Sequence, residues 1–113
     1  MLPAANRLRR QSDFQRLFRG GRTVRGKFLI LRIARTARTT RAGFVVSTAV
    51  SKAAVDRNRL KRQLRAAARE IGLPAHSDLA VIAMKSALHQ PYPAIIHDLR
   101  TLFHLADRPA PRR

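Results

Sequence analysis

The chain has 113 residues, enough for one domain, and 24 Lys and Arg residues against 6 Asp and Glu residues give it a formal net charge of +18. It contains no cysteine, which excludes a disulfide framework, a thiol nucleophile and a zinc site built on Cys. No apolar run approaches the roughly 20 residues that a membrane span needs, and the basic N-terminus lacks the apolar core of a secretory signal, so a cytoplasmic protein with no membrane partner is expected.

The positive charge is unevenly distributed along the chain. A compact body with this charge repels itself, and a polyanionic partner removes that cost. Arg binds phosphate at two points and stacks on bases, which favours nucleic acid as the partner. Residues 73–107 contain few basic residues and are read as scaffold. We therefore expect a basic arm over 1–11, a single RNA-binding domain over 12–107 and a disordered basic tail over 108–113.

A short helix is predicted near the N-terminus. Ser12 is a suitable N-cap, and Phe14, Leu17 and Phe18 recur at i, i+3 and i+4. The pair Gly20-Gly21 follows and ends this helix after about two turns.

Two strands are predicted next. Residues 27–34 and 42–47 are rich in β-branched and large apolar side chains, and the polar segment 36–41 between them suits a loop. Because these strands are consecutive, they are predicted to pair as an antiparallel hairpin.

The rest of the chain predicts a long helix, a buried strand and a final helix. The long helix covers 56–71 and ends at Gly72, and the strand over 78–84 is a continuous apolar run. The last helix follows Pro93, with apolar residues at helical spacing. The order α-β-β-α-β-α predicts an α+β single-domain sandwich with a small, mostly antiparallel sheet of about three or four strands.

The predicted helix over 56–71 carries most of the candidate functional residues. On a helical projection its cations and one amide fall within about 140° of one another, and its apolar residues gather on the opposite side. The candidates are Arg57, Asn58, Lys61, Arg62, Arg65 and Arg69, with Arg59 lying off this strip. No acid interrupts the run before Glu70, although like charges at these spacings cost a few tenths of a kcal/mol per pair. A solvated helix face is usually mixed in sign, so the pattern favours a surface that binds a polyanion.

The run Arg57-Asn58-Arg59-Leu60-Lys61-Arg62-Gln63-Leu64-Arg65 resembles the RNR signature of the bacterial ribonuclease P protein family. Residues 12–22, 41–47 and 78–83 resemble, in order, the N-terminal motif of that family, the strand before the signature and a late strand. The resemblance covers nearly the whole chain. It implies the family fold, in which the sheet and the first helix form a central cleft.

The resemblance implies a protein subunit of ribonuclease P. In that family the catalyst is an RNA, and the protein binds this catalytic RNA and precursor tRNA and assists magnesium-dependent removal of the 5′ leader. Mg²⁺ is then bound mainly through RNA, with no catalytic residue and no metal ligand in the chain, and no obligate protein partner is inferred. The alternative is a ribosomal or other structured-RNA-binding protein with no role in tRNA processing.

The resemblance also assigns residues to a cleft for the single-stranded leader. Phe14 and Phe18 are expected to line it, with Phe44 and Arg32 as further members, because aromatic faces stack on bases of any sequence. For each phenylalanine the alternative is a core position. For Asn58 the alternative to RNA binding is a structural contact with the loop before the helix.

Two positions depart from the family pattern. Ala66 follows Arg65 where the family often has an acid. Arg32 stands near a position where the family often has an aromatic residue in the cleft. A cation then replaces one base-stacking partner.

Overall fold

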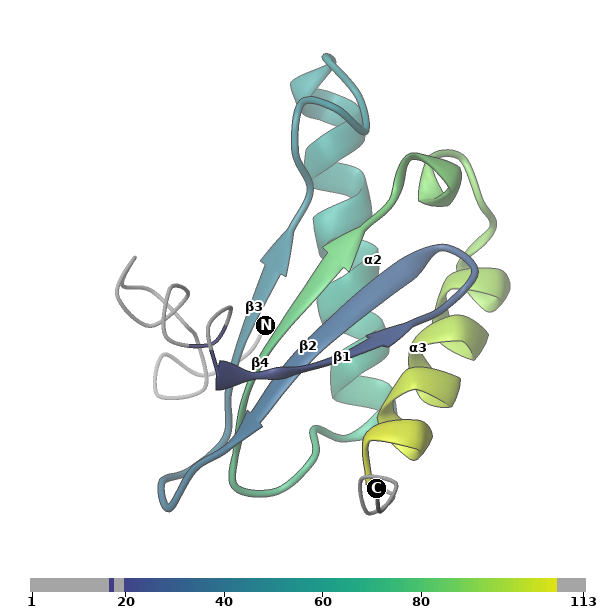
Figure 1. Ribbon diagram of the computed structural model, residues 1–113. Coiled ribbons are helices and arrows are strands. Elements are labelled where there is room, and N and C mark those ends of the chain that lie inside the picture. Colours follow the sequence, from purple (N-terminus) through teal and green to yellow (C-terminus); the bar gives the residue numbers. More distant parts are fainter. Residues whose placement is uncertain (1–16, 18–19, 108–113) are drawn as a thin grey trace.

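The computed structural model describes residue 17 and residues 20–107, in which α2 and α3 pack on one face of a four-stranded sheet (Figure 1). The elements are β1 (Arg22–Arg25), β2 (Leu29–Arg35), β3 (Arg41–Val45), α2 (Ala54–Ile71), β4 (Ser77–Ala83), the 3-10 turn η2 (Lys85–Ala87) and α3 (Tyr92–Ala106). The α+β class is confirmed. The predicted arm and tail lie outside the described residues. In the described part of the chain, no helix combines the length and the apolar character needed to cross a bilayer.

The strands lie in the order β1-β2-β4-β3. β1 and β4 both pair antiparallel with β2, and β3 pairs parallel with β4. α2 makes the crossover between the two parallel strands. In Figure 1 α2 lies behind the sheet, and β4 lies to the right of β3. The crossover is therefore left-handed, which is the rare hand for a connection between parallel strands.

The predicted hairpin is wrong, because β4 lies between β2 and β3. Six of the seven residues of β4 are buried, and the backbone N–H and C=O groups of so buried a strand need hydrogen-bond partners along both edges, so β4 takes a central place with a neighbour on each side. β1 is absent from the sequence prediction. Its four residues, RTVR, form an edge strand that is short and carries two cations, which is typical of sheet edges.

The core lies between the sheet and the two helices. Alternate residues of β2 and β4 face the helices, and among them Leu29, Leu31, Leu79 and Val81 are fully buried. They belong to one buried cluster with Leu60 and Leu64 of α2 and with Ile95, Leu99 and Leu102 of α3. Burial of each such side chain contributes about 1.5–3 kcal/mol, so this layer fixes the orientation of α2 and the direction in which its other flank points.

A buried carboxylate ties α3 to the turn between β1 and β2. Asp98 accepts hydrogen bonds from the backbone N–H groups of Lys27, Phe28 and Leu29, each at 3.0 Å. These bonds offset the cost of removing the carboxylate from water. Gly26 lies against the same group, and a Cβ atom there would be 2.6 Å from Asp98 Oδ2. The turn therefore requires glycine at position 26.

The opposite face of the sheet is not covered by α2 and α3, and we call it the open face. Leu17 packs on it against Ala80 and Ala34 and is 2% exposed. Leu17 and Gly20 are helical and Gly21 is not, which agrees with the predicted end of the first helix. The Gly21 N–H donates to the Leu17 carbonyl at 2.7 Å, and a Cβ atom on Gly21 would collide with that oxygen.

Candidate nucleic-acid interface

Hydrogen bonds in the loop before α2 set where the helix begins. Ser51 Oγ donates to Asp56 Oδ2 at 3.2 Å, and Arg57 Nη1 donates to the Ser51 carbonyl at 2.9 Å. The helix begins at Ala54, two residues before the predicted start. A structural contact with this loop was the alternative role for Asn58. In the structure Arg57 makes such a contact, and Asn58 is exposed.

α2 separates an apolar flank from a charged flank, as its periodicity predicts. Leu60, Leu64, Ala67 and Ala68 are buried in the core. We call the charged flank the cationic strip, which consists of Arg57, Asn58, Lys61, Arg62, Arg65 and Arg69. Some members are exposed and others half-buried, which is typical of long side chains whose apolar stems lie along the protein.

The cationic strip carries little compensating charge. No acid occurs between Arg57 and Arg69, and the nearest are Asp56 in the first turn and Glu70 in the last. The ion pairs found within the described residues both involve Asp78, which lies on the sheet. The positive potentials of neighbouring cations add, so the strip attracts a polyanion.

Arg59 lies apart from the cationic strip, as the helical projection predicts. It is exposed and lines a hollow between α2 and the segment 88–90. The seven candidates on α2 are thus divided between two flanks of one helix.

The two described cleft candidates lie on opposite faces of the sheet. Phe44 is in register with Val81 and packs against the core between the sheet and the helices. Arg32 is in register with Ala80 on the open face, where Leu17 packs. The two side chains do not line one groove, so the assignment of Phe44 to the cleft is corrected to a core position. The side chains of β3 alternate between faces, and Phe44 falls on the side of the helices.

Arg32 is engaged by other parts of the protein. Its Nη2 donates to the Leu17 carbonyl at 3.1 Å, and its Nη1 donates to Thr23 Oγ1. A cation at the last carbonyls of a helix is favourable, because these groups carry the negative end of the helix dipole. Phe14 and Phe18 lie outside the described residues.

The open face carries side chains that the sequence interpretation did not single out. Ile30 of β2 lies beside Ile82 of β4, and Ile82 lies beside Val45 of β3, all half-buried. Arg25 of β1 lies next to Ile30 at the edge of the sheet. The result is an apolar floor with a basic rim. The alternation in β2 is visible in the sequence, but the neighbours across the strands follow only from the observed strand order.

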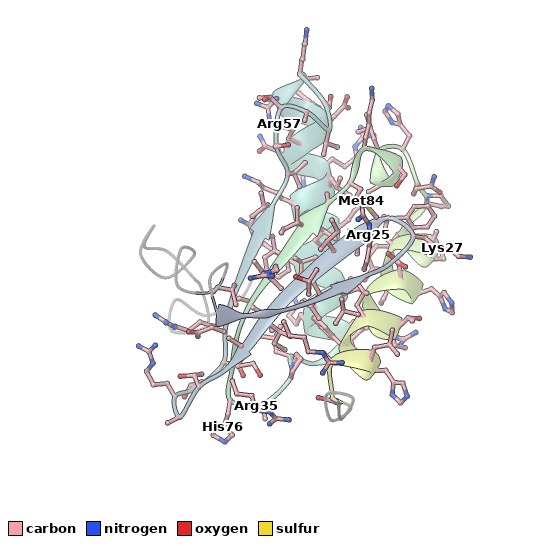
Figure 2. The ribbon with its side chains drawn as sticks, viewed as in Figure 1. Arg25, Lys27, Arg35, Arg57, His76 and Met84 are labelled. Atoms are coloured by element: carbon pink, nitrogen blue, oxygen red, sulfur yellow. The ribbon has the colours of Figure 1, made fainter. Side chains whose placement is uncertain are left out.

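A second basic group lies at one end of the sheet. Arg41 donates two hydrogen bonds to Asp78, at 3.1 and 3.0 Å, and Arg38 lies 3.6 Å from the same carboxylate. Figure 2 shows Arg35 and His76 close together at this end. The Asp78 carboxylate lies within 4 Å of two arginines, and Arg35 adds a third cation at the same end of the sheet, so this end is also positive.

Three of the five acidic side chains in the described part of the chain are engaged in the fold, at separate places. Asp78 pairs with Arg41, Asp98 accepts three backbone N–H groups and Asp56 accepts from Ser51. Over residues 17 and 20–107, no three His, Cys, Asp or Glu side chains gather closely enough to hold a metal ion. Magnesium prefers carboxylate, water and phosphate oxygens, and Asp56, Asp78 and Asp98 do not converge on a common point where such an ion could be shared.

Comparison with protein families gives a match over nearly the whole chain. The Ribonuclease P family matches residues 2–107. The ribonuclease P protein component of Salinispora tropica is 38% identical over 135 aligned positions, which cover 100% of this chain and 98% of that protein. The corresponding protein of Pseudanabaena sp. is 52% identical over 73 residues, which cover 63% of each chain.

Solved structures agree with this match. The RNase P protein of Staphylococcus aureus superimposes with a TM-score of 0.83 at 25% identity, covering 91% of this chain and 96% of that one. The RNase P protein of Thermotoga maritima superimposes with a TM-score of 0.77 at 26% identity, covering 86% and 94%. These matches favour ribonuclease P over the alternative of a ribosomal protein. The chain belongs to the ribonuclease P protein family and is therefore a protein component of the endoribonuclease holoenzyme that processes the 5′ ends of tRNA.

Proposed function

We propose that the chain binds the catalytic RNA of ribonuclease P through the cationic strip and binds the 5′ leader of precursor tRNA on the open face. In this role it assists magnesium-dependent removal of the leader, and the RNA performs the cleavage. The observation that carries the proposal is the cationic strip itself. The core fixes one flank of α2, and the other flank presents cations with no acid between Arg57 and Arg69.

The dimensions of the cationic strip suit a phosphate backbone. A helix rises 1.5 Å per residue, so the strip from Arg57 to Arg69 extends over about 18 Å, which is long enough to follow several phosphates. Each cation that neutralises a phosphate releases condensed counterions, and this release drives binding. The contacts carry no sequence information, so they position the protein on its RNA.

The composition of the open face suits a single strand. Ile30, Ile82 and Val45 provide an apolar floor, and Arg25 provides a basic rim. The resemblance assigns Phe14 and Phe18 to the same cleft, where stacking contributes about 1–3 kcal/mol per base for any sequence. Such a surface accepts leaders that differ in sequence.

Three carboxylates with structural roles support a division of labour between protein and RNA. Asp56, Asp78 and Asp98 are each held by hydrogen bonds within the fold. In the proposal, Mg²⁺ is held mainly by RNA phosphates, and the protein contributes binding energy and position. No proton transfer or nucleophile is assigned to the chain.

A reconstitution assay tests the catalytic part of the proposal. The full chain, freed of RNA, is incubated with precursor tRNA at low magnesium, with and without the catalytic RNA from the same organism. We expect the 5′-matured product only when the catalytic RNA is present. Cleavage by the RNA-free protein would contradict the assignment of catalysis to RNA.

The salt dependence of binding tests the role of the cationic strip. Lys61, Arg62 and Arg65 are replaced together by Ala, while Arg57 is kept because it holds the loop before α2. We expect the slope of log affinity against log salt to fall by up to about one unit per lost phosphate contact. An unchanged slope would show that this flank does not meet RNA.

A control variant removes exposed cations away from α2. Lys85 of η2 and Arg100 of α3 are exposed and lie outside the cationic strip. Their replacement by Ala lowers the net charge but should leave most of the slope in place. An equal fall in both variants would indicate a response to net charge alone.

A further inference from the structure

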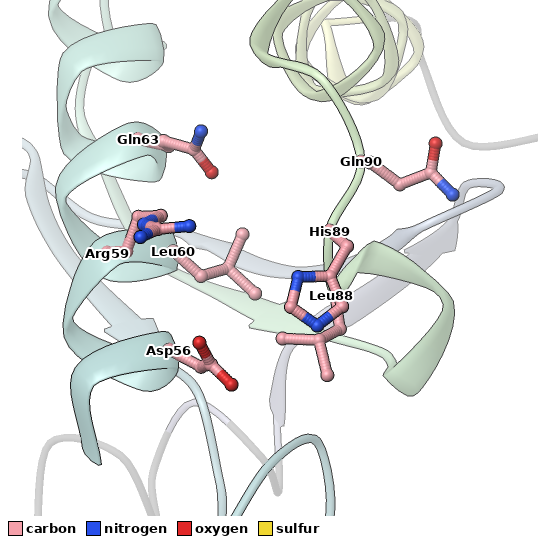
Figure 3. A pocket seen from close by; sticks show the side chains of 7 residues that line it. All are labelled: Asp56, Arg59, Leu60, Gln63, Leu88, His89 and Gln90. Atoms are coloured by element: carbon pink, nitrogen blue, oxygen red, sulfur yellow. The ribbon is translucent and has the colours of Figure 1, made fainter. Parts of the chain in front are cut away.

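A hollow on the other flank of α2 has a lining that suits a nucleobase. It lies between the first half of α2 and the segment 88–90 and has a volume of about 160 Å³. It is lined by Asp56, Arg59, Leu60, Gln63, Leu88, His89 and Gln90. Figure 3 shows Asp56 and Gln63 pointing from α2 toward the segment 88–90, with the His89 ring on the opposite side. The hollow belongs neither to the cationic strip nor to the open face.

The lining combines an apolar floor with polar and planar walls. Leu60 is buried and Leu88 is half-buried. The Asp56 carboxylate only accepts hydrogen bonds, while the Gln63 amide both donates and accepts. The His89 imidazole adds a planar face. Unpaired bases in RNA are recognised in this way, by stacking on such planes and by hydrogen bonds to the base edge.

We infer that this hollow binds one unpaired guanine of the RNA, an inference that rests on the proposed function. Guanine is the base that offers two adjacent N–H donors, N1–H and the N2 amino group, to one carboxylate. Asp56 Oδ2 accepts from Ser51, but a carboxylate has about four lone-pair sites, so acceptor capacity is left for the base. The Gln63 amide can then donate to guanine O6.

The backbone at His89 is held in an uncommon conformation. Its φ is 65°, in the left-handed region that few residues other than glycine adopt. Such strain persists where the surrounding structure fixes it and is often found at binding sites. At this position it places the imidazole over the hollow, opposite α2.

Arg59 connects the hollow to the cationic strip. Arg62 belongs to the strip, and Arg59 lies one helical turn before it on the flank of the hollow. An RNA backbone that follows the strip can therefore direct one base around the exposed side of α2 into the hollow. This arrangement accounts for the position of Arg59 off the strip.

Binding of free nucleotides tests the choice of base. The four nucleoside 5′-monophosphates are added separately to the full chain, and NMR follows the side-chain amide of Gln63 and the ring of His89. Because all four carry the same phosphate, a difference among them reports the base. We expect GMP to shift both signals and the other three to shift them less. Equal shifts with all four nucleotides, or none with GMP, would overturn the inference.

Binding of the full catalytic RNA gives a test with a definite sign. Asp56→Asn removes a negative charge, so electrostatics alone predicts tighter binding to RNA. Loss of a guanine contact instead predicts about tenfold weaker binding, with the salt slope unchanged because no phosphate contact is lost. Gln63→Ala should also weaken binding, whereas Thr101→Ala, on the exposed side of α3, should bind like the wild type.

A third variant removes the ring at the hollow without disturbing the backbone. His89→Asn keeps a residue that tolerates the left-handed conformation. It should weaken RNA binding as Gln63→Ala does. If the pocket variants bind like the wild type while the strip variant loses its salt slope, the guanine site is wrong and the proposed function stands. If the strip variant also keeps its slope, the proposed function fails.

Discussion

Arg32 reaches across the open face and donates a hydrogen bond of 3.1 Å to the carbonyl of Leu17, the helical residue that packs on the sheet. The same guanidinium donates to Thr23 on the neighbouring strand. Arg32 thus links β2, β1 and the end of the first helix.

Replacement of Arg32 should therefore lower stability. For Arg32→Ala we expect the free energy of unfolding to fall by about 1–2 kcal/mol, because a charge-assisted hydrogen bond to a half-buried carbonyl is lost. Urea unfolding of the full chain measures it. Arg32→Lys keeps the charge but cannot reach both partners with one planar group. If the lysine variant matches the wild type, charge alone explains the effect and the two-point link is wrong.

Asp98 gives a second prediction about stability. Asp98→Asn replaces one acceptor oxygen by an NH₂ group that faces either the backbone N–H of Lys27 or those of Phe28 and Leu29, so one or two buried donors lose their acceptor. Each buried donor left without an acceptor costs about 1–3 kcal/mol, so we expect a loss of roughly 2–4 kcal/mol in urea unfolding. A loss below about 0.5 kcal/mol would mean that the turn between β1 and β2 does not depend on this carboxylate.

Two glycines test the same contact from the other side. A Cβ atom on Gly26 would meet the Asp98 carboxylate at 2.6 Å, whereas Gly20 has no heavy atom within 4 Å of such a position. Gly26→Ala should therefore destabilise the chain, and Gly20→Ala should be neutral or slightly stabilising because it restricts the unfolded chain. Thermal unfolding of the two variants measures the difference. Equal melting temperatures would contradict the crowding at Gly26.

The helices and strands were predictable where the local sequence pattern alone determines the secondary structure. The apolar run of β4 and the amphipathic period of α2 identify these elements locally, and their predicted bounds differ from the observed bounds by at most two residues. Strand order was not predictable in this way. A hairpin requires that strands adjacent in sequence pair, whereas the buried strand β4 pairs along both of its edges and separates β2 from β3.

The candidate site was predictable to a similar extent. The division of α2 into a buried flank and the cationic strip follows from one helical period, and the structure brings Lys61, Arg62 and Arg65 to one side. The face of Phe44 depends on its register with β4, and the contact of Arg57 with Ser51 depends on the course of a loop. Neither of these relationships is encoded in local spacing.

Phe44, which packs against the core, should respond to substitution differently from Phe14 and Phe18, which are expected to bind the leader. Phe44→Ala removes a side chain packed on the core and should lower stability by about 2–3 kcal/mol, with equal effects on precursor and mature tRNA once the protein is folded. Phe14→Ala or Phe18→Ala should weaken binding of the leader-bearing precursor more than that of mature tRNA. Affinities for the two RNAs, measured beside urea unfolding, separate these roles. Equal losses on both RNAs for Phe14→Ala and Phe18→Ala would assign them to packing.

Ala66 allows a test of the uninterrupted charge on α2. A glutamate there lies four residues after Arg62 and three before Arg69, so it can pair with both. Ala66→Glu should stabilise the helix by a few tenths of a kcal/mol and weaken RNA binding, because the paired cations are less available to phosphate. The slope of log affinity against log salt should fall by up to about one unit.

Ala66→Gln provides the uncharged match, since glutamine has a similar size and helix propensity. It should bind RNA with the slope of the wild type. Titration of the catalytic RNA at several salt concentrations compares the three proteins. If the glutamate and glutamine variants give the same slope, the charge at position 66 does not act on the cations beside it. The strip between Arg62 and Arg69 then does not bind phosphate through the charge of these cations.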